Sequence, residues 1–210
     1  MAAKHLAIGL MLLCGMVGAA SACQKKTNPV FEDNFKNADA GWGQPDNVAA
    51  FTPQGLVLTP PVSGSGWRSD ANLSMAQSDW CIEVVNPTSL PTPADEDAVG
   101  AVGIWFWGKD LQNFYTATIT LDGKASVDRL NHGIWQVVVP AAAAPSVNAA
   151  PGSVNEIEIV TSGKMAAFYV NGQLVTNITG QPPANGGPPG LYGESGAKGT
   201  TWIFRRVALY

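Results

Sequence analysis

Residues 100–139 read GAVGIWFWGKDLQNFYTATITLDGKASVDRLNHGIWQVVV. β-branched and aromatic residues dominate this stretch, no proline interrupts it, and Asp122-Gly123 offers a tight turn between two alternating runs. Together these features predict consecutive β-hairpins. The fold class is therefore all-β at the centre of the chain.

The flanking sequence repeats the same signals. Residues 155–178 predict two further hairpins, turned at Ser162-Gly163 and at Asn171-Gly172, the latter a favoured type I′ pair. Shorter strands are expected at 48–52, 55–60, 80–85, 190–195 and 201–210, whereas the alanines of 140–145 lie between two prolines and predict a loop. No long helix is expected, and about a dozen short strands indicate a two-sheet antiparallel sandwich.

Composition narrows the classes of partner. The chain is 46% hydrophobic with 23 Gly and 15 Pro, which suits a sheet protein with many turns. Charged residues make up 13%, the net charge is −4, and Lys and Arg form no run. This pattern lacks the basic surface that nucleic acids and anionic lipids require, so neither is an expected partner.

The first residues have the features of a secretory signal. Lys4 precedes an apolar run over 6–20, and Ala20-Ser21-Ala22 fits an A-x-A cleavage site. We therefore expect a signal peptide over 1–22, a short lead-in over 23–30 and a single β-sandwich domain over 31–210. The mature protein would be periplasmic or extracellular, without a transmembrane segment.

Two cysteines remain after the signal. In an oxidising compartment Cys23 and Cys81 most simply form a disulfide. The alternative reads Ala20 to Cys23 as a bacterial lipobox, which would make Cys23 a lipid anchor and leave Cys81 as a free thiol. Both interpretations stay open at this point.

Short motifs along the chain are those of a known superfamily: Asp33-Asn34-Phe35, Gly41-Trp42, Gly103 to Phe106, Lys109-Asp110, Asn113 to Tyr115, Asp122-Gly123, Asp128-Arg129, Gly133 to Trp135, and Asn155 through Gly172. In these pieces the chain resembles the concanavalin A-like lectin/glucanase superfamily, within it the laminin-G-like and 3-keto-disaccharide hydrolase-like domains of secreted bacterial proteins. The resemblance implies a jelly-roll sandwich and a carbohydrate or cell-envelope glycan as the partner.

The catalytic motifs of that superfamily do not carry over. The hydrolase-like branch has an Asn-Ser-Gly stretch where this chain has Ala98 to Gly103, and the glucanase E-x-D-x-x-E strand is reduced to Glu156-Ile157-Glu158. These departures favour a non-catalytic role.

A candidate ligand site follows from strand parity. If Ile104, Phe106, Tyr115, Ala117 and Ile119 form the core face, as the resemblance implies, the opposite face carries Trp105, Trp107, Phe114, Thr116, Thr118, Ser126 and Asp128. Flat aromatic rings stack on a pyranose, while hydroxyls and a carboxylate bind its hydroxyl groups. The candidate ligand-binding residues are Trp105, Trp107, Phe114, Thr116 and Asp128. A register slipped by one would instead place both tryptophans in the core.

Other acidic and basic groups give weaker signals. Glu156 and Glu158 alternate with isoleucines on one strand, a pattern typical of a solvent-facing surface. Asp95 and Asp97 are weak calcium candidates, and no other metal or cofactor is expected. His132 is the only histidine of the mature chain and lies in a turn without a nucleophile motif, so no catalytic residue is assigned.

These observations favour an exported, non-catalytic carbohydrate-binding protein. The first alternative is a periplasmic glycoside-processing enzyme of the 3-keto-disaccharide hydrolase type that uses carboxylates such as Asp128 or Glu158. The second is a structural envelope protein without a small ligand. A binder requires exposed aromatic rings in a groove, and an enzyme requires two converging acids with separated pKa values.

Overall fold

A computed structural model describes residues 23, 26–36, 40–70, 72–74, 76–89 and 99–210. The signal segment 1–22 and the calcium candidates Asp95 and Asp97 lie outside these residues. The described strands are β1 (Phe31–Asp33), β2 (Ala49–Thr52), β3 (Gly55–Leu58), β4 (Ser65–Ser69), β5 (Ser78–Val85), β6 (Ala101–Asp110), β7 (Asn113–Thr120), β8 (Lys124–Asn131), β9 (Ile134–Ala143), β10 (Val154–Ser162), β11 (Met165–Val170), β12 (Gln173–Thr179), β13 (Gly190–Glu194) and β14 (Trp202–Leu209). The element order also includes one 3-10 turn, η2 (Ala40–Trp42).

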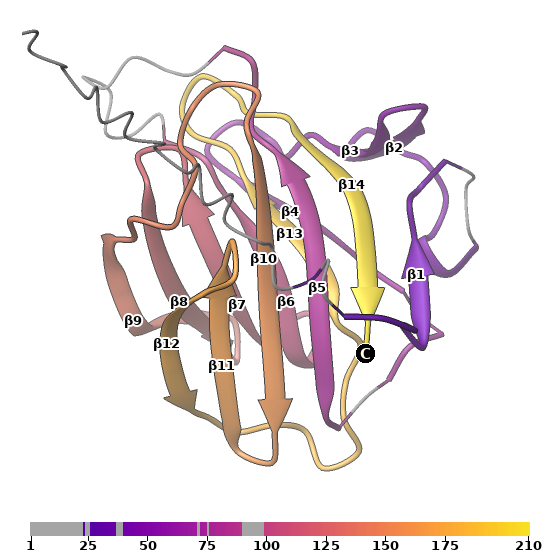
Figure 1. The fold of residues 1–210 in the computed structure, drawn as a ribbon, viewed down its shortest axis with the longest axis vertical. Coiled ribbons are helices and arrows are strands. Elements are labelled where there is room, and N and C mark those ends of the chain that lie inside the picture. The colour runs from indigo at the N-terminus through magenta and orange to yellow at the C-terminus, as the bar shows by residue number, and fades with distance from the viewer. Residues whose placement is uncertain (1–22, 24–25, 37–39, 71, 75, 90–98) are drawn as a thin grey trace, which may run out of the picture.

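The strands form two antiparallel sheets packed face to face (Figure 1). The eight-stranded sheet has the order β12-β11-β10-β5-β14-β3-β2, with β1 also paired to β14. The six-stranded sheet has the order β4-β13-β6-β7-β8-β9. Alternate residues of both sheets form one buried core between them, which includes Ile104, Ile157 and Trp202. The predicted all-β, two-sheet antiparallel sandwich is confirmed.

The predicted hairpin turns are present. Gly123 between β7 and β8 has a φ of 81°, and Asn171 and Gly172 between β11 and β12 have φ values of 50° and 78°, as a type I′ turn requires. The remaining turn is displaced by one residue, because Ser162 still pairs with Met165 and leaves Gly163-Lys164 as the loop. Local turn chemistry thus sets the register of these hairpins.

The prediction of a loop over 140–145 was wrong for most of that segment. Strand β9 continues through Pro140 to Ala143. It is an edge strand, since only β8 pairs with it. A proline has no N–H to donate, and an edge strand leaves alternate N–H positions unpaired, so Pro140 is tolerated here.

Asp33, at the end of β1, holds the following residues in place by hydrogen bonds. Its Oδ2 accepts a hydrogen bond from Trp42 Nε1 at 3.0 Å, and its Oδ1 accepts one from the Phe35 N–H at 2.7 Å. Phe35 and Trp42 are both buried and their rings meet edge to face with centroids 5.3 Å apart. The residues Asp33, Phe35 and Trp42 of the motif therefore close one end of the core.

Cys23 is bonded to Cys81, with their Cα atoms 6.1 Å apart. The predicted disulfide is thus present, and it uses the sulfur that a lipid anchor would need. Tyr210 Oη donates a hydrogen bond to the Cys23 carbonyl at 3.0 Å, and the Lys26 ammonium contacts both Asp79 and Glu158. These contacts hold the N-terminal residues on the outer face of the eight-stranded sheet.

The expectation that Glu156 and Glu158 face solvent was wrong. Both are buried, because Cys23 and Lys26 lie over this part of β10. Burial raises the pKa of each carboxyl above its ordinary value, and the ion pair with Lys26 partly offsets this for Glu158. Glu158 therefore serves as an anchor for the N-terminal segment.

Within the described residues no helix has the length and apolar character needed to cross a membrane.

Candidate functional site

Strand register places most of the predicted ligand-binding residues on one face. Directly opposed residues in neighbouring strands point to the same side of a sheet. Trp105 on β6 opposes Thr116 on β7, which opposes Asp128 on β8, and Phe114 lies two residues before Thr116. These four residues share the outer face of the six-stranded sheet, away from the core.

Trp107 is the exception, and its predicted orientation was wrong. The β6–β7 register shifts after Phe106, and Trp107 has a φ of 47°. This bulge turns its indole into the core, where its ring contacts Phe106 and Tyr115. A side chain at Gly108 would overlap the indole of Trp105, so the glycine leaves room for that ring beside the bulge.

Trp105 lies on the predicted face but is not an open platform. Its side chain is only 3% exposed. Its ring stacks on Phe114 with centroids 4.6 Å apart and meets Trp67 of β4 edge to face at 6.3 Å. Trp105 therefore forms the floor of this face beneath other aromatic rings.

The exposed aromatic residue of this face is Trp135 on β9. Its side chain is 47% exposed, and its ring lies 6.3 Å from Tyr192 of β13 and 5.6 Å from Phe114. β9 and β13 are four strand spacings apart, about 19 Å in a flat sheet. The sheet must therefore curve toward its outer side, and we call this surface the concave face.

Several hollows open on the surface of the molecule, and one of about 380 Å³ lies on the concave face. It is lined by Ser63, Gly64, Ser65, Val99, Trp135, Tyr192, Glu194, Ser195 and Gly196. We call it the Trp135 pocket. It combines an exposed indole with hydroxyl groups and one carboxylate.

The polar groups of the concave face are ordered by hydrogen bonds. Tyr192 Oη donates to Glu194 Oε1 at 2.7 Å, and burial next to this carboxylate raises the pKa of the tyrosine. On the neighbouring strands the Ser126 hydroxyl donates to Asp128 Oδ2 at 3.3 Å and lies 3.1 Å from the Thr118 hydroxyl. Hydroxyls and carboxylates thus stand in fixed positions beside the aromatic rings.

The raised pKa of the Asp128 carboxyl predicts that this residue destabilises the folded protein as the pH rises. Burial raises the pKa of its carboxyl, the Ser126 hydrogen bond lowers it, and the charge of Glu194 raises it. The folded protein therefore binds this proton more tightly than the unfolded chain, whose aspartate pKa is about 4. The resulting stability is present below about pH 4 and is lost as the pH rises through the folded pKa.

We expect Asp128→Asn to remove this loss. The unfolding free energy of the variant relative to the wild type should increase between pH 4 and pH 7, as measured by urea unfolding at both pH values. A difference that stays constant or decreases would show that burial of this carboxylate is not unfavourable.

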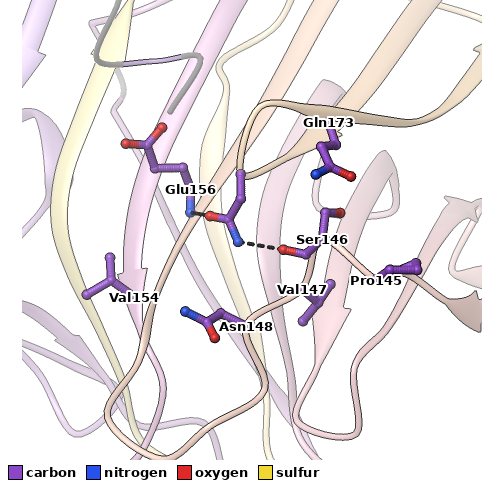
Figure 2. Close-up of a pocket in the computed structure, with 8 residues that line it drawn as sticks. Pro145, Ser146, Val147, Asn148, Val154, Glu156 and Gln173 are labelled. Atoms are coloured by element: carbon purple, nitrogen blue, oxygen red, sulfur yellow. Dashed lines mark hydrogen bonds between the residues drawn. The ribbon is translucent and has the colours of Figure 1, made fainter. Parts of the chain in front are cut away.

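A second hollow, of 410 Å³, lies beside the eight-stranded sheet between residues 145–148 and the β11–β12 turn (Figure 2). Asn171 spans it: its Oδ1 accepts the Glu156 N–H at 2.8 Å and its Nδ2 donates to the Ser146 carbonyl at 2.7 Å. The Glu156 carboxylate extends away from Ser146 and Gln173 in Figure 2. Asn171 therefore holds the 145–148 loop to β10 of the sheet.

The same asparagine belongs to a buried network centred on Asn155. Asn155 is fully buried, its Oδ1 accepts from Asn148 N and Asn171 Nδ2, and its Nδ2 donates to Asn86 Oδ1 and the Asn148 carbonyl. Asn155→Ala should lower the unfolding free energy by about 2–4 kcal/mol, because it leaves several buried partners unsatisfied. Urea unfolding would measure this, with Asn177→Ala on the exposed side of β12 as the matched control. A loss below about 0.5 kcal/mol would contradict the network's importance.

The sequence analysis missed three residues of the concave face: Trp135, Tyr192 and Glu194. Trp135 had a signal in the sequence, since it closely follows Asn131-His132-Gly133, which the sequence places in a turn between strands. The structure has this turn, with positive φ at His132 and Gly133. Tyr192 and Glu194 reach this face through the pairing of β13 with β6, which joins residues about 90 positions apart. The ligand-binding role of all these residues, and the predicted role of Trp105, Phe114, Thr116 and Asp128, stays a prediction.

Comparison with known proteins identifies the fold. No protein-family model matches the sequence, and no curated protein matches it at the level of sequence. Among solved structures, the Bacillus licheniformis β-glucanase superposes with a TM-score of 0.61 at 14% identity, over 88% of this chain and 99% of that one. The carbohydrate-binding module CBM66 from Bacillus subtilis gives 0.59 at 17% identity, over 78% and 91%.

A third structure, a β-1,3-1,4-glucanase (lichenase) from a mouse hindgut metagenome, gives a TM-score of 0.58 at 12% identity, over 85% of this chain and 97% of that one. All three are concanavalin A-like jelly-roll proteins. The two-sheet sandwich described above therefore has the concanavalin A-like jelly-roll fold. At these identities the likeness establishes the fold alone.

Proposed function

We propose that this protein binds carbohydrate on the concave face of its six-stranded sheet, at the Trp135 pocket. The observation that carries the proposal is the exposed Trp135 indole beside the hydrogen-bonded pair of Tyr192 and Glu194. An open aromatic ring next to fixed hydroxyl and carboxylate groups suits a ring that is apolar on its C–H face and polar at its edge.

The charges of the pocket favour a neutral saccharide. Glu194 is the only charged side chain among the described residues that line it, and the charge of Asp128 also acts on this face. An anionic sugar would meet two carboxylates without a compensating cation in the lining. A neutral oligosaccharide with an exposed pyranose face is therefore the proposed ligand class.

Similar structures support a glycan as the partner, and the disulfide supports an exported location. The structures with TM-scores near 0.6 include a carbohydrate-binding module and two glucanases by name. The Cys23–Cys81 disulfide is consistent with an oxidising compartment. We accordingly propose an exported protein, periplasmic or extracellular, whose partner is a glycan rather than a nucleic acid.

A glycoside hydrolase is the second candidate, favoured by one observation. Asp128 and Glu194 lie on the same concave face and are close enough for the charge of Glu194 to raise the pKa of Asp128. A protonated and an ionised carboxyl are the pair that such enzymes use. Glu158, the other acid considered from the sequence, lies on the opposite sheet and is paired with Lys26.

A glycan array tests the proposal. The oxidised, folded protein should bind neutral oligosaccharides. Parallel runs with and without the chelator EDTA are needed, because the predicted calcium site at Asp95 and Asp97 has not been tested. No binding to any neutral glycan by folded protein would contradict the proposal. Incubation of each bound glycan with the protein, followed by a reducing-end assay, separates the two candidates, since only a hydrolase produces new reducing ends.

A further inference from the structure

Two adjoining hollows lie at the end of the sandwich where β7 begins. They have volumes of 500 and 420 Å³ and share Tyr115, Arg129 and Gln181 in their linings. The first extends to Lys109 and His132, and the second to Lys164 on the β10–β11 turn. We call the pair the Arg129 cleft. Neither hollow shares a lining residue with the Trp135 pocket.

The charge of this cleft is opposite to that of the chain as a whole. Lys109, Arg129 and Lys164 line it, and none of the described lining residues is acidic, although the chain carries a net charge of −4. The neighbouring carboxylate, Asp110, is exposed and does not itself line the cleft; it accepts hydrogen bonds from Gln112 N and from Nδ2 of Asn113, which is a lining residue. The field in the cleft therefore attracts anions.

Arg129 is held in place by neutral groups. Its guanidinium lies 5.2 Å from the centroid of the Tyr115 ring, and its Nη2 donates to Gln181 Oε1 at 2.9 Å. The Gln181 N–H in turn donates to Tyr115 Oη at 3.1 Å. A guanidinium ordered in this way has already lost much of its side-chain freedom, which lowers the entropic cost of binding.

Arg129 differs from the other three arginines of the chain. Arg68 pairs with Asp46, Arg205 lies 3.9 Å from Glu83, and Arg206 pairs with Glu32. The contacts recorded for Arg129 among the described residues are with Tyr115 and Gln181, neither of which carries a negative charge. Its forked donors are therefore positioned without a carboxylate to neutralise them.

We propose that the Arg129 cleft binds the oxyanion of an acidic sugar: a carboxylate, a sulfate ester or a phosphate ester. The guanidinium fork matches these groups bidentately, and Lys109 and Lys164 add charge on either side. The amides of Asn131 and Gln181 in the lining are suited to the hydroxyl groups of the attached ring, whereas the Asn113 amide is already bonded to Asp110 and to His132 N. This site goes beyond the proposed function, since it is separate from the Trp135 pocket and takes an anionic ligand.

Calorimetric titration with glucuronate, glucose 6-sulfate, glucose 6-phosphate and glucose tests this site at low ionic strength. The three anionic sugars should bind in the cleft, and glucose should not. The order of their affinities shows whether the site prefers a carboxylate, a sulfate ester or a phosphate ester. Arg129→Gln should weaken binding about 10-fold or more, Arg129→Lys less, and the exposed Lys164→Gln about 3-fold. Arg205→Gln on the other sheet removes the same charge and should leave the affinity unchanged.

Three results would overturn the site. Folded wild-type protein that binds none of the anionic sugars lacks it. An equal loss with Arg205→Gln would show only the effect of net charge. Full affinity in both Arg129→Gln and Lys164→Gln would place the anion elsewhere. Because none of these variants touches the Trp135 pocket, failure here leaves the binding of neutral glycans to be judged separately.

Discussion

Trp135→Ala is expected to reduce the affinity for a neutral oligosaccharide about 30- to 100-fold, the largest effect of any single change in the Trp135 pocket. The indole is half exposed and forms the open aromatic wall of the pocket, so its removal takes away the surface on which a pyranose would stack. Trp135→Phe, which keeps a smaller ring, should lose less. Titration of a glycan identified on the array measures each affinity.

Val137→Ala is the matched control for this change. Val137 is 68% exposed, lies two residues along β9 and points to the same side of the strand. It does not line the Trp135 pocket; it lines the separate Arg129 cleft, for which an anionic ligand is proposed, so it should not affect a neutral oligosaccharide in the Trp135 pocket. Unchanged affinity in Trp135→Ala, or an equal loss in Val137→Ala, would show that the indole is not the platform for the ligand.

The second large effect concerns the disulfide. Replacing Cys23 and Cys81 together by alanine should lower the unfolding free energy by about 4 kcal/mol, because the crosslink joins residues 58 positions apart and restricts the unfolded chain. Urea unfolding of the oxidised wild type and the double variant measures this loss. Alanine is chosen because Cys81 is almost fully buried, and a serine hydroxyl there would add its own cost.

Lys26→Gln serves as the control for the disulfide. It removes the contacts with Asp79 and Glu158 while leaving the crosslink in place. It should cost less than the double cysteine variant, since the Lys26 side chain is partly exposed. A double cysteine variant as stable as the wild type would contradict the view that this crosslink stabilises the sandwich.

Much of the fold was readable because its signals are local. Alternation along β7 and β8 and the turns at Gly123 and Gly172 depend on neighbouring residues, and these elements lie where the sequence predicts them. The order of the strands in each sheet depends instead on pairing between distant segments. No local sequence pattern indicates that β13 lies between β4 and β6.

The candidate site was predictable only in part for the same reason. Parity placed Trp105, Phe114, Thr116 and Asp128 on one face, but it failed at Trp107, where the backbone bulge before Gly108 reverses the side of the strand. The burial of Glu158 could not be predicted from its own strand. It depends on the pairing of Cys81 with Glu158 across β5 and β10, because the disulfide from Cys23 to Cys81 then brings the N-terminal residues over this carboxylate.

Fluorine NMR of protein labelled with 5-fluorotryptophan tests the central claim most directly, because the seven tryptophans report on different places. A bound neutral oligosaccharide should shift the Trp135 resonance strongly and leave Trp42, Trp80 and Trp202, which are buried in the core between the sheets, unchanged. Trp135→Phe assigns the signal. A saccharide that binds without moving the Trp135 resonance, or that leaves all seven unmoved at saturating concentration, would contradict carbohydrate binding on the concave face.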